Sequence, residues 1–105
     1  TAVTAARVRA SGEALRQAGR AEADEAEASF RDALAIARRQ GARWLELRAA
    51  ASLAGALAAR RRVRQAERVL SPVCRAFPAA EACADLAAAR RMLARTDWAF
   101  VHQNP

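Results

Sequence analysis

The sequence predicts an all-α fold of antiparallel helix pairs, with about five helices in total. Apolar residues recur at steps of three and four along most of the chain, which is the period of one buried helix face. Alanine fills many of these positions, and its small side chain lets helices lie close together. Sustained alternation of the kind that marks a strand is not found in any stretch.

Composition limits the size of the core. The chain has 105 residues, the length of one small domain or of a piece of a larger protein. Hydrophobic residues make up 53% of it, but most of them are alanine. Burial stabilises a fold in proportion to the apolar area removed from water, so we expect a thin core of modest stability.

Charge and cysteine content limit which kinds of partner and site the chain can have. All basic side chains are arginine, and the net charge of +7 permits an acidic partner without requiring one, because acidic residues are interleaved. Two cysteines, Cys74 and Cys83, are too few for a disulfide framework or a zinc site. We expect packed free thiols, with a regulatory disulfide as the alternative.

Neither a membrane span nor a secretory leader is recognisable, which predicts a cytoplasmic protein without membrane contact.

The first two helices are expected over residues 3–18 and about 22–40. Gly19 is the predicted stop of the first, because glycine adopts the left-handed conformation at little cost. Acidic residues in the first turn of the second helix complement its dipole, and Gly41 ends it. One face of this second helix carries the apolar residues Ala26, Phe30, Ala33, Leu34 and Ala37.

Three further helices are expected over residues 42–60, 63–77 and 81–95. A turn must fall in the arginine run that follows residue 59, although neither glycine nor proline marks it. Pro72 predicts a kink or a restart, because proline removes a helical hydrogen bond and clashes one turn back. Trp44 is expected in the core or half-buried between units; an exposed Trp44 would instead be a binding anchor. Residues 96–105 form a tail without a clear period.

Two parts of the chain resemble each other, and both resemble the tetratricopeptide repeat. Ala26 followed by Phe30 matches Ala66 followed by Leu70, and a small or β-branched residue comes three positions later in each. The resemblance implies a right-handed α-solenoid over residues 1–95, with units at about 3–40 and 42–77. Its period is longer than the usual ~34 residues. The implied packing residues are Gly12, Leu15, Ala26, Phe30, Ala33, Leu53, Ala54, Leu57, Ala66, Leu70 and Val73.

A closer resemblance covers residues 8–95 and is strongest at 26–54. This part looks like the C-terminal repeat region of large bacterial multidomain signalling ATPases, including adenylate-cyclase-like proteins and transcriptional regulators. Ser71-Pro72-Val73 and Ala84-Asp85-Leu86 match that pattern, whereas RRRVR and CRAFPAAEAC depart from it. The resemblance implies a fragment or C-terminal sensor region, so any catalytic activity of a parent protein would lie outside this chain.

The sequence therefore favours a non-catalytic interaction or scaffold module that needs no cofactor and no metal. His102, in the tail, is the only histidine, and no glycine-rich phosphate loop occurs. The expected partner is a protein, a peptide or a neighbouring domain of a parent protein. The exposed faces of the terminal repeats could also join two copies of the chain in a homodimer. The candidate groove lies on the outward side of helix 42–60, at Arg43, Glu46, Arg48 and Ser52.

An alternative function is binding of nucleic acid or another polyanion through residues 60–68. An arginine cluster there could dock phosphate groups or an acidic partner, or could be a solvated helix end. Absence of an aromatic platform beside it disfavours nucleic acid. The cluster, called the basic patch below, consists of Arg60, Arg61, Arg62, Arg64 and Arg68.

Overall fold

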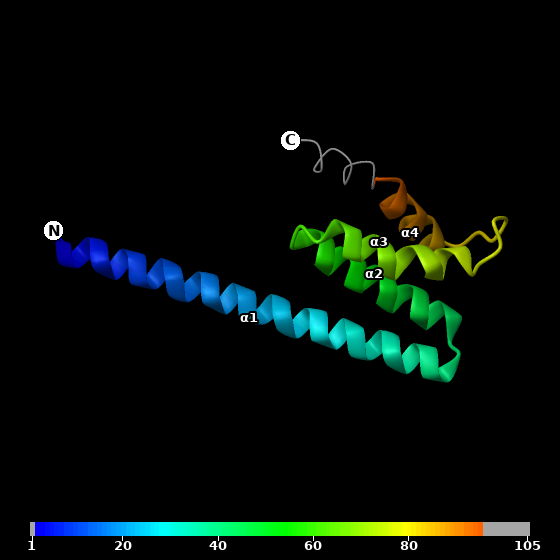
Figure 1. Cartoon of the computed structure of the whole chain (residues 1–105), viewed down its shortest axis with the longest axis horizontal. Helices are drawn as coiled ribbons and strands as arrows, with labels where there is room; N and C mark the ends of the chain where they lie inside the picture. Colours follow the sequence, from blue (N-terminus) through cyan, green and yellow to red (C-terminus); the bar gives the residue numbers. More distant parts are fainter. Residues whose placement is uncertain (1, 96–105) are drawn as a thin grey trace.

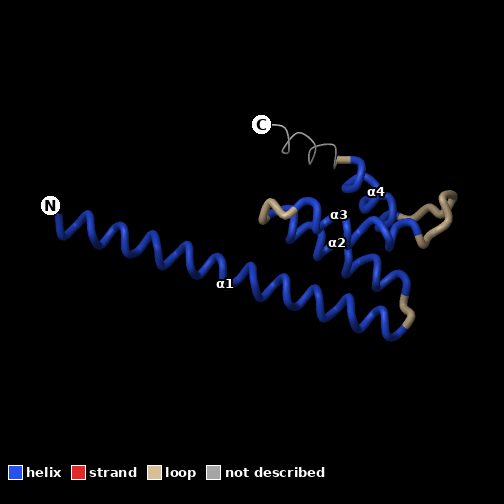
Figure 2. The backbone as a smooth tube through the Cα atoms, in the orientation of Figure 1, coloured by secondary structure: helices blue, strands red, loops and turns tan. Residues whose placement is uncertain are grey.

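The computed structural model describes the backbone of residues 2–95 and the side chains of residues 12–95. The described backbone is entirely helical apart from its turns and one loop, and it contains no strand (Figure 2). The predicted all-α class is therefore confirmed. Figure 1 labels the four helices, which are α1 (Ala2–Gln40), α2 (Arg43–Ala59), α3 (Val63–Arg75) and α4 (Ala84–Ala94).

The predicted break at Gly19 is wrong. α1 is one helix of 39 residues, so residues 3–40 form no helix pair, and the described part of the chain has four helices instead of about five. Glycine inside a helix costs only about 1 kcal/mol relative to alanine, and strong helix formers flank Gly19 on both sides. An ion pair between Glu13 and Arg16 at 2.9 Å adds support one turn earlier. The N-terminal half of α1 projects away from the other helices (Figure 1).

The core surrounds α2, which packs against α1, α3 and α4. Among the described side chains of α1, Leu34 and Ala37 are buried in this core and Phe30 packs against it. The three buried alanines of α2, Ala49, Ala50 and Ala54, let the neighbouring backbones approach closely. The largest side chains that are fully buried are Leu47, Leu53, Leu57, Leu70 and Leu86.

Both helix–helix turns use one residue in the left-handed backbone region. Gly41 has φ 64° between α1 and α2, and the amide of Ala42 donates to the carbonyl of Ala37 at 3.0 Å. Between α2 and α3 the same role falls to Arg61, with φ 63°. The amide of Arg62 then donates to the carbonyl of Leu57 at 2.9 Å. The turn expected in the arginine run is present, and an arginine forms it where glycine is the usual residue.

The last part of the core is closed by the loop between α3 and α4. α3 runs through Pro72 to Arg75 without the restart that the proline suggested. Phe77, in the loop, is buried at 7% exposure. Arg90 of α4 holds the loop by donating to the carbonyls of Glu81 and Pro78, both at 3.0 Å.

The packing residues implied by the repeat resemblance fall into two groups. Those of the second unit are all buried between α2 and α3. In the first unit Phe30 is half-buried against the core, but Ala33 is exposed and Leu15 is 74% exposed. Residues 3–18 do not fold back, so Leu15 and Gly12 have no second helix to pack against, contrary to expectation. The buried group is Leu53, Ala54, Leu57, Ala66, Leu70 and Val73.

Candidate interaction surface

Large apolar side chains reach solvent at the start of α2. Trp44 is 42% exposed and Leu45 is 51% exposed, whereas Leu47, two residues later, is fully buried. The apolar stripe that faces the core begins at Leu47. Leu45, two positions earlier, lies on another side of the helix, whereas Trp44, three positions earlier, lies at the edge of that stripe. Exposed apolar groups of this size in a hollow are typical of interaction sites. Two hollows flank this part of α2, and Leu45 lines both.

The first hollow lies between the starts of α2 and α4, has a volume of about 260 Å³, and is called the Trp44 hollow here. Trp44 packs against Phe77, with ring centroids 4.7 Å apart and the rings tilted by 39°. Because Phe77 is buried, this contact fixes one face of the indole and leaves the rest open to a ligand. The hollow is lined by Trp44, Leu45, Arg48, Cys83 and Asp85.

An ion pair spans the Trp44 hollow. Arg48 of α2 donates to the carboxylate of Asp85 at 3.0 Å, and their side chains are 68% and 46% exposed. Asp85 lies in the first turn of α4, where the helix dipole also favours its negative charge. An exposed pair of this kind contributes little to stability. Its two charges can therefore be exchanged for those of a ligand at low cost.

The second hollow is a groove of about 380 Å³ between α1 and α2, called the α1–α2 groove here. Its walls are mainly apolar. Phe30, which is half-buried, and Ile36, which is 45% exposed, both line it. The groove is lined by Phe30, Ala33, Ile36, Ala37, Gln40, Leu45, Arg48, Ala49 and Ser52.

The four groove residues expected from the sequence have different surroundings. Arg48 lines both hollows, and Ser52 is exposed on the α1–α2 groove. Glu46 faces Arg38 of α1 at 3.8 Å, while Arg43 is exposed and makes no ion pair with any described side chain. Sequence reasoning did not select Leu45. Its position outside the stripe that starts at Leu47 is the signal that could have identified it.

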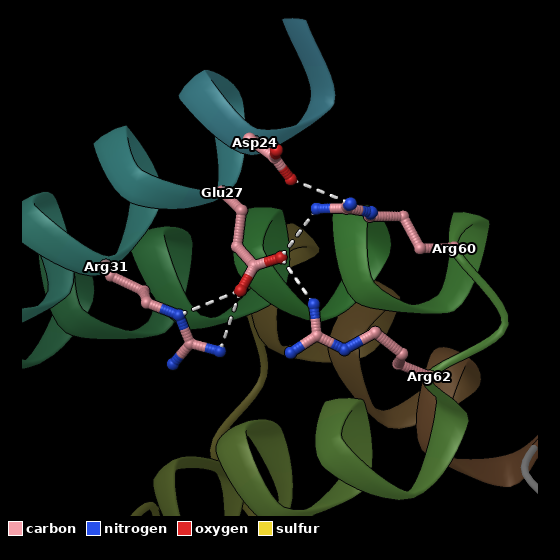
Figure 3. A network of polar contacts seen from close by, with 5 residues as sticks. All are labelled: Asp24, Glu27, Arg31, Arg60 and Arg62. Carbon is pink, nitrogen blue, oxygen red and sulfur yellow. Dashed lines mark hydrogen bonds and ion pairs between the residues drawn. The ribbon is translucent and has the colours of Figure 1, made fainter. Parts of the chain in front are cut away.

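The basic patch is partly occupied by carboxylates of its own chain (Figure 3). Arg60 lies 2.7 Å from Asp24 and 3.0 Å from Glu27, and Arg62 lies 2.7 Å from the same Glu27 oxygen. Arg31 approaches the other Glu27 oxygen at 3.1 Å. These contacts tie α1 to the turn between α2 and α3. The exposed members that make no ion pair with any described residue are Arg61, Arg64 and Arg68.

The arginines set the protonation of Glu27. Burial raises the pKa of its carboxyl group, since the side chain is only 14% exposed. The hydrogen bond from Arg31 and the positive charges of Arg62 and Arg31 outweigh this effect, so the pKa lies below its ordinary value. Glu27 is therefore a stable carboxylate at neutral pH and suits a structural role better than proton transfer.

Both cysteines are free thiols. Cys74 is buried in α3, and burial raises the pKa of its thiol despite the nearby charge of Arg90. Cys83 is half-buried at the start of α4, where its sulfur accepts a hydrogen bond from the amide of Leu86 at 3.4 Å. Cys74 is enclosed by the core, so it does not lie in an open setting of the kind that activates a nucleophile.

The described residues contain no cluster of three or more His, Cys, Asp or Glu side chains that could hold a metal ion. Within the same part of the chain, no helix is both long and apolar enough to cross a membrane. The tail residue His102 lies outside the described residues. Comparison of the chain with protein-family models, with curated proteins and with solved structures gave no match.

Proposed function

We propose that this chain is a non-catalytic protein–protein interaction module that binds its partner at the Trp44 hollow. The observation that carries the proposal is the placement of Trp44, which is 42% exposed, held on one face by Phe77, and set beside the exposed Leu45. A rigid aromatic side chain on the edge of a hollow is the usual form of an interface hot spot.

The partner that fits this hollow is a peptide or domain surface with one large apolar side chain flanked by charge. The apolar group would seat against Trp44 and Leu45, the two large apolar side chains that line the hollow. A carboxylate of the partner would take over Arg48 from Asp85. Exposed pairs exchange at little net cost, so this contact adds specificity and orientation more than affinity.

We further propose that the module is of the helical-repeat type, a tetratricopeptide-like right-handed α-solenoid. Support comes from the antiparallel hairpin of α2 and α3, whose contact contains the buried alanines Ala54 and Ala66. α4 packs on both helices of this hairpin, as the first helix of a following unit would. In this proposal the chain is a repeat region of a larger bacterial signalling regulator, and its partners include neighbouring domains of that protein.

The proposal is tested by titrating a partner domain into the chain and following tryptophan fluorescence. A Trp98→Phe background leaves Trp44 as the single reporter. Trp44→Ala, followed by calorimetry, should weaken binding by about tenfold or more, as removal of an aromatic anchor does. Ile36→Ala removes an equally exposed apolar side chain from the α1–α2 groove and should leave the affinity unchanged. An unchanged affinity in Trp44→Ala would place the binding site elsewhere, and equal losses in both variants would mean that the Trp44 hollow is not the specific site.

The polyanion alternative is weaker. Arg60 and Arg62 already face Asp24 and Glu27, which leaves three exposed arginines for an outside ligand. Binding through them would depend steeply on salt, because each neutralised phosphate releases counterions. Tight DNA binding at low salt that Arg64→Ala and Arg68→Ala together abolish would favour this alternative.

A further inference from the structure

The described side chains in the N-terminal half of α1 leave one helix face, which carries Leu15, without a neighbour. Leu15 is 74% exposed, and a Cβ added at Gly12 or Gly19 would meet nothing within 4 Å. This face continues along the helix to Ile36, which also lines the α1–α2 groove. It is called the α1 face below and consists of Gly12, Leu15, Gly19, Glu22, Ala26, Ser29, Ala33 and Ile36.

The spacing of the α1 face is that of a helix–helix seam. Its members follow one another at alternating steps of three and four, which is the heptad spacing of a coiled coil. Every seventh residue from Gly12 to Ala33 is glycine or alanine. Small residues at this interval let a second helix approach closely, and they leave room for large side chains such as Leu15.

The charges along α1 favour one orientation of that second helix. Residues 2–20 contain four arginines and one glutamate, whereas residues 21–40 contain five carboxylates and three arginines. A second copy of α1 that runs antiparallel places the basic half of each helix beside the acidic half of the other. A parallel copy would place like charges together. Antiparallel pairing also sets the two helix dipoles in opposition.

We propose that two copies of this chain form a dimer through the α1 face, with their α1 helices antiparallel. Leu15 of each copy lies over Ala26 of the other, and the N-terminal half of each α1 occupies the α1–α2 groove of the other, beside Phe30. The two contacts are equivalent, as a two-fold axis requires. Trp44 lies outside this interface, whereas Leu45 and Arg48 line both the groove and the Trp44 hollow. The mass in solution tests the dimer without any ligand at the Trp44 hollow, so a failure of one proposal is distinguishable from a failure of the other.

The same N-terminal half could cover the groove of its own chain only by folding back. That would break the helix at Gly19, where α1 is continuous. Pairing between copies keeps every helical hydrogen bond of α1 and covers the same apolar groups.

The mass in solution tests the dimer. Light scattering coupled to size exclusion should give twice the chain mass of 11.3 kDa. Leu15→Glu should weaken self-association by about a hundredfold or more, because it replaces the large apolar side chain that lies over Ala26 with a carboxylate that would be buried without a partner. Gln17→Glu adds the same charge outside the α1 face and should leave the dimer intact. If circular dichroism shows that Leu15→Glu loses helicity, Leu15→Ala serves in its place. A monomer at millimolar concentration would overturn the proposal.

Disulfide trapping tests the orientation. In a Cys74→Ala, Cys83→Ser background, a mixture of the Leu15→Cys and Ala26→Cys variants should form a disulfide-linked heterodimer on mild oxidation. Gln17→Cys mixed with Ala26→Cys should link much more slowly. The doubly substituted chain Leu15→Cys/Ala26→Cys should link between copies. Efficient linkage within one monomeric chain would mean that residues 2–18 fold back, and it would contradict the proposal.

Discussion

Glu27 of α1 accepts a hydrogen bond from Arg62 at 2.7 Å, although the two residues are 35 positions apart in the sequence. The same carboxylate also binds Arg60 and Arg31 (Figure 3). One acidic side chain thereby fixes the turn between α2 and α3 against α1. The contact explains why an arginine run can form a tight turn: two of its charges are neutralised within the chain.

Replacing Glu27 with glutamine should lower the melting temperature at neutral pH. The neutral amide cannot attract three guanidinium groups, and it leaves Arg60 and Arg62 facing each other with less compensation. We expect a smaller loss than truncation of a core leucine causes. Glu25→Gln removes an exposed carboxylate that makes no ion pair with any described residue, and it should change the melting temperature very little. Thermal unfolding followed by circular dichroism measures both variants.

The contribution of Glu27 should disappear in acid. Its pKa is lower in the folded chain than in the unfolded one, so its stabilising effect is fully present above the unfolded pKa and is lost as the pH falls through the folded pKa. The difference in the free energy of unfolding between the native chain and Glu27→Gln should be constant near neutrality and shrink below about pH 4.3, the ordinary glutamate value. A difference that grows in acid would contradict this assignment.

Much of the fold could be predicted from the sequence. The expected helices 42–60, 63–77 and 81–95 correspond to α2, α3 and α4 within three residues at each end. The period of Leu47, Leu53 and Leu57 is unambiguous, and burial of such a stripe dominates the packing. Arg48 could be selected because it lies opposite that stripe on the helix.

The predicted helix end at Gly19 was wrong and the contacts of Glu27 were not predicted, for different reasons. Glycine is a weak stop signal, because its helical penalty of about 1 kcal/mol is easily offset by its neighbours. Gly41 ends a helix and Gly19 does not, although no local rule separates them. The contacts of Glu27 with Arg60 and Arg62 join segments whose proximity depends on the packing of α1 against α2. The pattern of residues in one sequence does not show that these two segments lie close together in the fold.

The two left-handed turn residues give a matched test. Arg61 has φ 63°, a region that costs a side-chain-bearing residue roughly 1 kcal/mol, so Arg61→Gly should raise the free energy of unfolding by up to about that amount. Gly41 has φ 64°, and a Cβ there would meet nothing within 4 Å. Gly41→Ala should therefore lower the free energy of unfolding by about 1 kcal/mol, through backbone strain alone.

Urea titration at neutral pH measures both turn variants. Arg68→Gly is the control, because this residue is exposed in the interior of α3, where glycine should be destabilising by about 1 kcal/mol. Destabilisation by Arg61→Gly of the same size as that by Arg68→Gly would mean that residue 61 does not adopt the left-handed conformation.

The two thiols should differ in reactivity. Cys83 is half-buried and close to the surface, whereas Cys74 is buried and its pKa is raised by that burial. A thiol-specific reagent should therefore label Cys83 first and Cys74 only at the rate of local opening. Cys83→Ser should remove the fast phase of labelling, and serine is a preferred N-cap residue for the start of α4. Fast labelling of one thiol in Cys83→Ser would contradict the buried position of Cys74.

Leu53 lies at the centre of the core, and its truncation tests whether α2 organises the fold. Its side chain is fully buried, so Leu53→Ala should lower the free energy of unfolding by about 2–5 kcal/mol, through lost burial and the cavity left behind. Leu45→Ala makes the same chemical change on the same helix at a side chain that is 51% exposed, and it should cost under about 1 kcal/mol. Denaturant titration measures the free energy of unfolding of both variants. Similar losses would mean that Leu45 is buried in solution, and both hollows beside α2 would then be closed.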